Sequence, residues 1–298
     1  MRVFVTGATG FIGAPLTAEL IGAGHHVVGL ARSESAAEAL AAAGADVHRG
    51  SVDDLESLRR GVEEADGVIH LAFIHDFSNF QENCEIDRRA IEAMGKELAG
   101  SDRPFLVTGG IGALAPGRSA TELDEHLSSA HFPRNASEEA ADVAAKRGAR
   151  VSVVRLPQVH DPRKQGLVMW LTAHARENGV SVYVGDGANR WPAVHVGNAA
   201  HLYRLALETN AEPGTRYHAV AEEGVPLREI AEAVGRRIGV PVKSITPEAA
   251  TEHFGWRARM AMADLPGSSA LTRERLGWNP MGPGLISDID RMREVVAS

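Results

Sequence analysis

Three glycines near the start of the chain have a spacing suited to holding a phosphate group. They lie in Thr6-Gly7-Ala8-Thr9-Gly10-Phe11-Ile12-Gly13, between the apolar run Val3-Phe4-Val5 and an amphipathic stretch. Such glycines permit a tight turn, a close approach of the backbone to a diphosphate, and close packing of a helix on a strand. The helix N-terminus adds free N–H groups and a positive dipole end. This context predicts a dinucleotide site, rather than an unliganded turn, formed by Gly7, Thr9, Gly10, Phe11, Ile12 and Gly13.

The end of the second apolar run bears on which dinucleotide is bound. A carboxylate there would accept hydrogen bonds from the adenosine 2′-hydroxyl of NAD, whereas an arginine suits a 2′-phosphate. The chain has Gly29-Leu30-Ala31-Arg32-Ser33 at this place, with no acid. Arg32 offers a planar fork to phosphate oxygens and Ser33 a hydroxyl donor, so we expect NADP(H) to be preferred over NAD(H). The alternative is that Arg32 is a solvated loop residue and that the adenosine end is unselective.

The order of apolar runs and helical patterns predicts an α/β fold of the Rossmann type, a doubly wound parallel sheet. Expected strands at 3–6, 26–30, 46–50, 67–72, 104–108 and 151–156 alternate with helical patterns at 11–22, 34–43, 55–58, 82–98 and 134–148. Ligands bind at the carboxyl ends of such strands. That edge adds Val52, Leu71, Ala72, Thr108, Pro157 and Val159 to the predicted coenzyme site.

Two parts of the chain are expected. Residues 1–160 form the coenzyme-binding domain, to which 190–215 are expected to return, and residues 161–298 form most of a smaller substrate-binding lobe. In the second part we expect helices at 167–177, 196–208 and 226–239, and strands at 180–184 and 217–220. The turn Gly185-Asp186-Gly187 separates two of these elements.

Composition excludes several other classes of protein. The net charge of −8 and the pI near 5.9 argue against a nucleic-acid partner. No apolar run approaches the ~20 residues that cross a bilayer, and no signal-peptide pattern precedes the first strand. The lone Cys84 excludes a disulfide framework, and no histidine pair is spaced with acids for a metal site. We therefore expect a cytoplasmic protein, a possible homodimer, that binds a small-molecule substrate and no metal.

Several motifs resemble the short-chain dehydrogenase/reductase superfamily. They are the glycine spacing, His70-Leu71-Ala72, Gly185-Asp186-Gly187 with Val194-His195-Val196, and Leu276-Gly277-Trp278-Asn279-Pro280. The chain looks most like the extended branch, which contains NAD-dependent epimerases and dehydratases. That family uses a Ser or Thr, a Tyr, and a Lys four residues after the Tyr. Here Gly110, Arg134 and Glu138 align with those positions. None of the three tyrosines has a lysine four residues later, so the resemblance implies an atypical member without the usual triad.

Other residues must then carry any chemistry. Arg134 and Glu138, four apart on a helix, could form a plain surface ion pair. Alternatively, Arg134 faces the nicotinamide and steadies an alkoxide or a substrate carboxylate, while Glu138 accepts ribose hydroxyls. Arginine stays protonated, so the proton donors considered are His131, Ser137 and His160.

The resemblance also places Gly110, Arg190, Trp191 and Trp170 at the substrate cavity. The leading hypothesis is an NADP(H)-dependent oxidoreductase that transfers hydride to or from a small carbonyl or alcohol. The alternatives are a non-catalytic NADP(H) sensor and an isomerase that retains its coenzyme.

Overall fold

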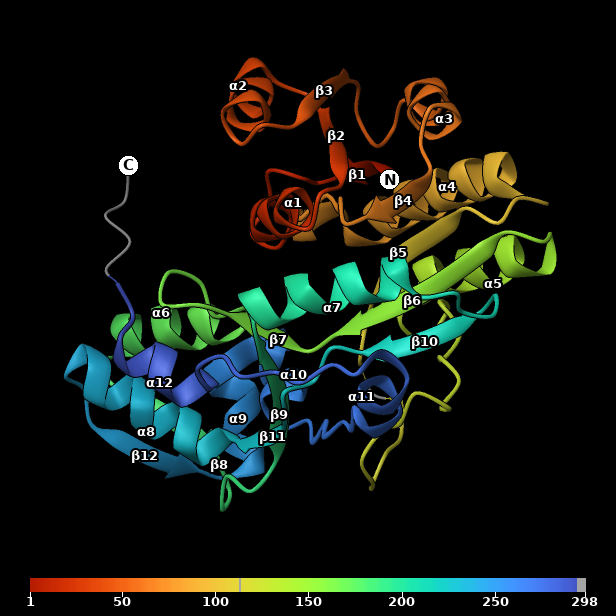
Figure 1. The fold of residues 1–298 in the computed structure, drawn as a ribbon. Coiled ribbons are helices and arrows are strands. Elements are labelled where there is room, and N and C mark those ends of the chain that lie inside the picture. The colour runs from red at the N-terminus through yellow and green to blue at the C-terminus, as the bar shows by residue number, and fades with distance from the viewer. Residues whose placement is uncertain (113, 294–298) are drawn as a thin grey trace.

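A parallel sheet of seven strands forms the centre of the molecule (Figure 1). The structure is a computed structural model and describes residues 1–112 and 114–293. The strand order is β10-β6-β5-β4-β1-β2-β3, so the winding reverses between β1 and β4. The strands are β1 (Arg2–Thr6), β2 (His26–Ala31), β3 (Asp46–Arg49), β4 (Gly67–His70), β5 (Pro104–Gly110), β6 (Arg150–Leu156) and β10 (Thr215–His218). A crevice at the carboxyl ends beside this reversal is where such sheets bind ligands.

Helices cover both faces of this sheet, which explains why its inner strands are largely apolar, whereas the edge strands β3 and β10 carry polar residues. One face carries α1 (Gly13–Gly22), α2 (Glu34–Ala42) and α7 (Val196–Glu208). The other face carries α3 (Leu55–Glu63), α4 (Phe80–Leu98) and α5 (Ala136–Lys146). Neighbouring side chains of β1 alternate between the two cores, with Val3 and Val5 in the first and Phe4 in the second. The predicted doubly wound α/β fold is confirmed.

A smaller lobe lies against the carboxyl edge and contains two further sheets (Figure 1). One sheet has the order β11-β9-β7 and consists of β7 (Gln158–His160), β9 (Arg190–His195) and β11 (Glu222–Pro226). The other sheet pairs β8 (Ser181–Val184) with β12 (Val242–Ile245). The helices of the lobe are α6 (Val168–Asn178), α8 (Leu227–Ile238), α9 (Pro247–Phe254), α10 (Ala258–Ala261) and α12 (Leu285–Asp290). The helix α11 (Ala270–Leu276) instead packs against α7 and β10 of the large sheet. Short 3-10 turns are η1 (Phe77–Asn79), η2 (Pro133–Asn135) and η3 (Gly255–Arg257).

The chain passes between the two parts more than once. β7 already pairs with β9 in the lobe, whereas α7 packs on the large sheet and β10 pairs with β6. Sequence patterns did not predict β9, because Pro192 interrupts the pattern and cannot donate a ladder hydrogen bond. The register of β9 against β11 shifts beside this proline, between the pairs Glu222–Ala193 and Val225–Trp191. That irregularity accommodates the proline inside a central strand.

Candidate active site

The loop between β1 and α1 has a shape that only glycine permits. Gly7 has a φ of +68°, and a Cβ there would lie 2.8 Å from the amide nitrogen of Ala72. A Cβ at Gly13 would lie 2.0 Å from the Gly7 carbonyl oxygen. No side chain caps α1 at its N-terminus, and Thr9 and Gly10 are exposed. The loop therefore leaves open backbone N–H groups at a helix N-terminus, a fit for the diphosphate of a dinucleotide.

The adenosine end of the predicted site lies where β2 meets α2. Arg32 is exposed and lies beside Asp53, whose pKa is lowered by a hydrogen bond from Ser51 and, to a smaller degree, by the Arg32 charge. Ser33 is the N-cap of α2, since its Oγ accepts from the amide of Ala36 at 3.2 Å. Within the described ranges Arg32 forms no ion pair with a carboxylate. An exposed arginine with a carboxylate beside it thus lies at the corner where β2 meets α2.

The ends of the middle strands meet the glycine loop. The amide of Ala72 donates to Thr6 Oγ1 at 3.2 Å, and that of Leu71 to the Thr6 carbonyl at 3.3 Å. Thr108 Oγ1 donates to the carbonyl of His70 at 2.8 Å. The other predicted coenzyme residues pack into the surrounding cores, with Val52 partly buried on the α3 side, Val159 buried beside α7, and Pro157 half-buried at the end of β6.

A buried charge network surrounds Arg134, the residue that we expected at the position of the family's tyrosine. Arg134 Nη1 lies 3.1 Å from Asp87 Oδ2, and its Nη2 donates to the carbonyl of Thr108 at 3.0 Å. The guanidinium lies 4.4 Å above the ring of Phe73. Burial alone would raise the pKa of Asp87, but the Arg134 charge and hydrogen bonds from His70 and Ser137 outweigh it and lower that pKa. Arg134 is thus held at the end of β5 by a carboxylate of α4.

His70 extends the network to the coenzyme loop. Its Nε2 lies 2.9 Å from Asp87 Oδ1 and its Nδ1 lies 2.7 Å from Thr6 Oγ1. A carboxylate only accepts, so the hydrogen-bond pattern assigns the proton to Nε2 and lets Thr6 donate to Nδ1. The line Thr6–His70–Asp87–Arg134 therefore connects β1 to the start of α5 without a break.

Glu138, which we expected at the position of the family's lysine, has partners other than Arg134. Its carboxylate accepts from Arg155 Nε at 2.9 Å and Nη2 at 2.7 Å, and from Arg216 Nε at 3.2 Å. Both Glu138 and Arg155 are almost fully buried. The surface ion pair considered between Arg134 and Glu138 is wrong, because each has a different buried partner. Glu138 ties α5 to β6 and β10.

The three proposed proton donors have different surroundings. His131 is exposed in the turn before η2. Ser137 is buried and donates its hydroxyl to Asp87 Oδ2. His160 is fully buried on β7, with Nδ1 2.7 Å from Asp288 Oδ2 of α12. The structure thus brings Ser137, but not His131 or His160, into the hydrogen-bond network of Arg134.

The predicted substrate residues fall in two places. A side chain at Gly110 would meet open space at the end of β5. Arg190 forms a paired hydrogen bond with Asp264, at 3.0 and 2.9 Å, on the lobe surface. Trp191 is fully buried in the lobe core. Trp170 packs edge-on against Phe254 in the cluster around α9. Lobe packing thus accounts for both tryptophans.

Sequence reasoning missed three side chains at the mouth of the site. Phe73 lies under Arg134, and its ring packs edge-on against His75 at 5.3 Å. Lys164 lies with its ammonium 5.4 Å from the ring centroid of Phe11. The pKa of His75 is lowered by burial and then by the charge of Lys164. His70-Leu71-Ala72 marks the strand that precedes Phe73 and His75, whereas no local signal singles out Lys164.

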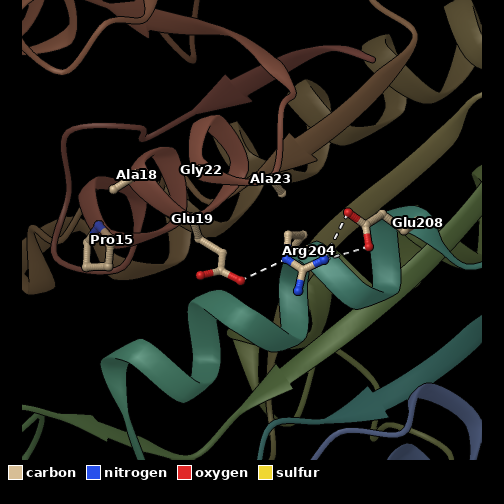
Figure 2. A pocket seen from close by; sticks show the side chains of 7 residues that line it. All are labelled: Pro15, Ala18, Glu19, Gly22, Ala23, Arg204 and Glu208. Carbon is tan, nitrogen blue, oxygen red and sulfur yellow. Dashed lines mark hydrogen bonds and ion pairs between the residues drawn. The ribbon is translucent and has the colours of Figure 1, made fainter.

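A separate groove of about 860 Å³ lies between α1 and α7 (Figure 2). Its charges pair with one another, since Arg204 bridges Glu19 and Glu208 with bonds of 2.8 Å to each. No predicted site residue lines this groove.

In residues 1–112 and 114–293, no helix has both the length and the apolar character that crossing a bilayer requires. Over the same ranges, no cluster of three His, Cys, Asp or Glu side chains is placed to hold a metal ion.

The sheet order and the glycine loop together define a dinucleotide-binding protein of the Rossmann class. Residues 3–219 match the model of the NAD dependent epimerase/dehydratase family, and the chain belongs to that family. The resemblance to extended short-chain dehydrogenases is thereby confirmed, and a nicotinamide dinucleotide is the coenzyme typical of the family.

Individual relatives cover nearly the whole chain. An uncharacterized protein of Schizosaccharomyces pombe is 46% identical over 291 residues, 97% of this chain and 98% of that protein. The 2′-dehydrokanamycin reductase of Streptomyces kanamyceticus is 29% identical over 259 residues, 83% of this chain and 69% of the relative. A dTDP-glucose 4,6-dehydratase from Streptomyces venezuelae, solved with NAD and TYD bound, has a TM-score of 0.76 at 18% identity, covering 98% of this chain and 96% of that one. At this low sequence identity, the similarity to the dehydratase structure shows the fold alone.

Proposed function

We propose that this protein is an NADP(H)-dependent oxidoreductase acting on the carbonyl or alcohol group of a small organic substrate. When bound, the coenzyme supplies or accepts a hydride at its nicotinamide ring. The observation that carries the proposal is the glycine loop joined by hydrogen bonds, through Thr6, His70 and Asp87, to an arginine at the catalytic position. Relatives named as reductases make net hydride transfer to a substrate reasonable, and a relative named as a UDP-glucose 4-epimerase keeps the isomerase as the alternative.

Arg134 has the central role in this proposal. Its guanidinium is held by Asp87 and by the Thr108 carbonyl, so it is fixed before substrate arrives. A preorganised cation stabilises an oxygen that gains negative charge in the transition state. Gly110, opposite, leaves room where the family's serine would project. Ser137 donates its hydroxyl to Asp87 and so helps to hold that carboxylate beside Arg134. We propose that the oxygen of the substrate exchanges its proton with water, because His160 is sequestered by Asp288.

Coenzyme choice is assigned in this proposal to the corner formed by Arg32 and Ser33. The exposed guanidinium of Arg32 suits two oxygens of a 2′-phosphate. Asp53 beside it makes the corner less basic, but its carboxylate already accepts from Ser51. The coenzyme form preferred is therefore NADP(H).

The test measures NADPH oxidation with a panel of aldehydes, ketones and 2-oxo acids, using stereospecifically deuterated NADPH to trace the hydride. We expect turnover with at least one member, and a loss of ~100-fold in kcat for Arg134→Lys with NADPH affinity retained. Arg118→Lys, in an exposed pair with Asp124, is the matched control.

Three outcomes separate the proposal from its alternatives. Turnover that Arg134→Lys does not change would remove the assigned role of that residue. NADPH binding without turnover of any panel member would favour a sensor. Coenzyme that stays bound through purification, with isomerisation and no net redox change, would favour the isomerase.

A further inference from the structure

A rigid turn after β7 fixes the position of one lysine. The Asp161 carboxylate accepts from the amides of Arg163 at 2.7 Å and Lys164 at 2.8 Å. The main chains of Asp161 and Lys164 also bond to each other in both directions. Gln165, fully buried, donates its side-chain amide to the Asp161 carbonyl at 2.7 Å. The backbone of Lys164 therefore has little freedom, although its side chain is exposed.

The Lys164 side chain points to the coenzyme loop. Its ammonium lies over the ring of Phe11, the residue between Gly10 and the start of α1. Its charge acts on His75, as does the charge of Arg134. Lys164 thus lies over Phe11, Arg134 lies over Phe73, and the charges of both act on His75.

Among Arg134, Arg163 and Lys164, only Lys164 lacks a carboxylate partner within the described ranges. Arg134 is neutralised by Asp87, and Arg163 by Asp161 at 3.0 Å. Lys164 forms no ion pair with any residue of the described ranges. In the lobe, Arg190 is similarly neutralised, by Asp264. An unpaired ammonium held over an aromatic face keeps its full attraction for an anion.

We propose that Lys164 binds an oxyanion over Phe11 and so selects an anionic ligand for the site. This inference rests on the proposed function, because that function places the coenzyme on the glycine loop. The oxyanion belongs either to the coenzyme diphosphate or to a carboxylate or phosphate group of the substrate. Both sources offer the same chemistry to the ammonium, a charge-assisted hydrogen bond.

The experiment compares Lys164→Gln with Arg163→Gln, which removes the same charge from the neighbouring residue of the same turn. NADPH is titrated into each protein at low salt, and pyruvate or inorganic phosphate is then titrated into the NADPH complex. If the coenzyme is the source, Lys164→Gln weakens NADPH binding about 10-fold. If the substrate is the source, NADPH affinity is unchanged and binding of pyruvate or phosphate weakens about 10-fold.

Two results would overturn the inference. One is a Lys164→Gln protein that matches the parent in every titration, and the other is an Arg163→Gln protein with the same loss. Failure of the parent itself to bind NADPH would instead overturn the proposed function on which the inference rests. Thermal unfolding of both variants checks that the turn is intact.

Discussion

The glycine loop and the start of α5 face the same edge of the sheet but are built in opposite ways. The loop presents backbone groups, and its shape depends on glycines at which a Cβ would collide with main-chain atoms. The start of α5 presents side chains, and its shape depends on the buried charges of Asp87, Arg134 and Glu138. The first region thus offers a ligand its backbone, and the second offers side chains. The hydrogen bonds of His70 to Thr6 and Asp87 join the two regions.

The two charges of the second region also differ from each other. Arg134 keeps a partly exposed face above Phe73, whereas Glu138 is enclosed by Arg155 and Arg216. A buried ion pair contributes little net stability, but removing one partner leaves an uncompensated charge. The region thus combines a structural half around Glu138 with a half around Arg134 that can still meet a ligand.

The largest effect is expected from Gly13→Ala. The new Cβ would lie 2.0 Å from the Gly7 carbonyl oxygen, so the loop must move and NADPH binding should fall by ~100-fold or more. Fluorescence titration measures the affinity. Gly22→Ala, at the other end of α1 with no atom in the way, should bind as the parent does. If Gly13→Ala bound NADPH with the affinity of the parent, the assignment of coenzyme binding to the glycine loop would be wrong.

Asp87→Asn should break the second region while leaving the first intact. The change leaves Arg134 without its buried counter-charge, which costs about 3 kcal/mol of the free energy of unfolding. Urea unfolding measures this loss, and activity should fall with it. Asp46→Asn removes a carboxylate from an exposed pair with Arg2 and His26 and should leave the unfolding midpoint unchanged. An unchanged midpoint for Asp87→Asn would contradict the account of the network.

Acidification should weaken the structural half through His218. Its Nδ1 donates to the Ser268 carbonyl at 2.8 Å, and its Nε2 lies 3.3 Å from Arg155 Nη1. Burial, and then the Arg155 charge, lower the pKa of His218 to about 4. The unfolded chain takes up this proton near pH 6.5, so the free energy of unfolding should fall between about pH 6.5 and pH 4, by roughly 2 kcal/mol. The His218→Gln variant should lose this part of the pH dependence, and an identical profile would refute the assignment.

Arg32→Ala should have the smallest effect and concerns the first region alone. Removing the Arg32 guanidinium should reduce the preference for NADPH over NADH about 10-fold and leave NADH affinity unchanged. Isothermal titration with both coenzymes measures the two affinities. Arg49→Ala, a nearby cation already paired with Glu34, serves as the control. Equal affinity of the parent for NADPH and NADH would show that the corner does not read the 2′-phosphate.

Much of the fold could be predicted because its signals are local. The apolar runs of β1, β2, β5 and β6 and the glycines of the loop lie within short stretches of sequence. The lobe was harder, since β7 is short, Pro192 interrupts β9, and these strands pair with strands that are distant in sequence. The sequence left the roles of Arg134 and Glu138 open for the same reason, because their partners are distant in sequence. Helical spacing brings them near each other, but it does not reveal competing partners from other elements.

The sequence by itself determined the sheet, the coenzyme loop and the loss of the family's tyrosine and lysine, because each depends on residue type at fixed local spacing. Only the tertiary structure decided the partners of the charges. Asp87 reaches Arg134 across 47 positions, and Lys164 reaches the Phe11 ring from the far side of the sheet edge. Such contacts follow from how parallel strands end side by side, and no local pattern records which side chains they bring together.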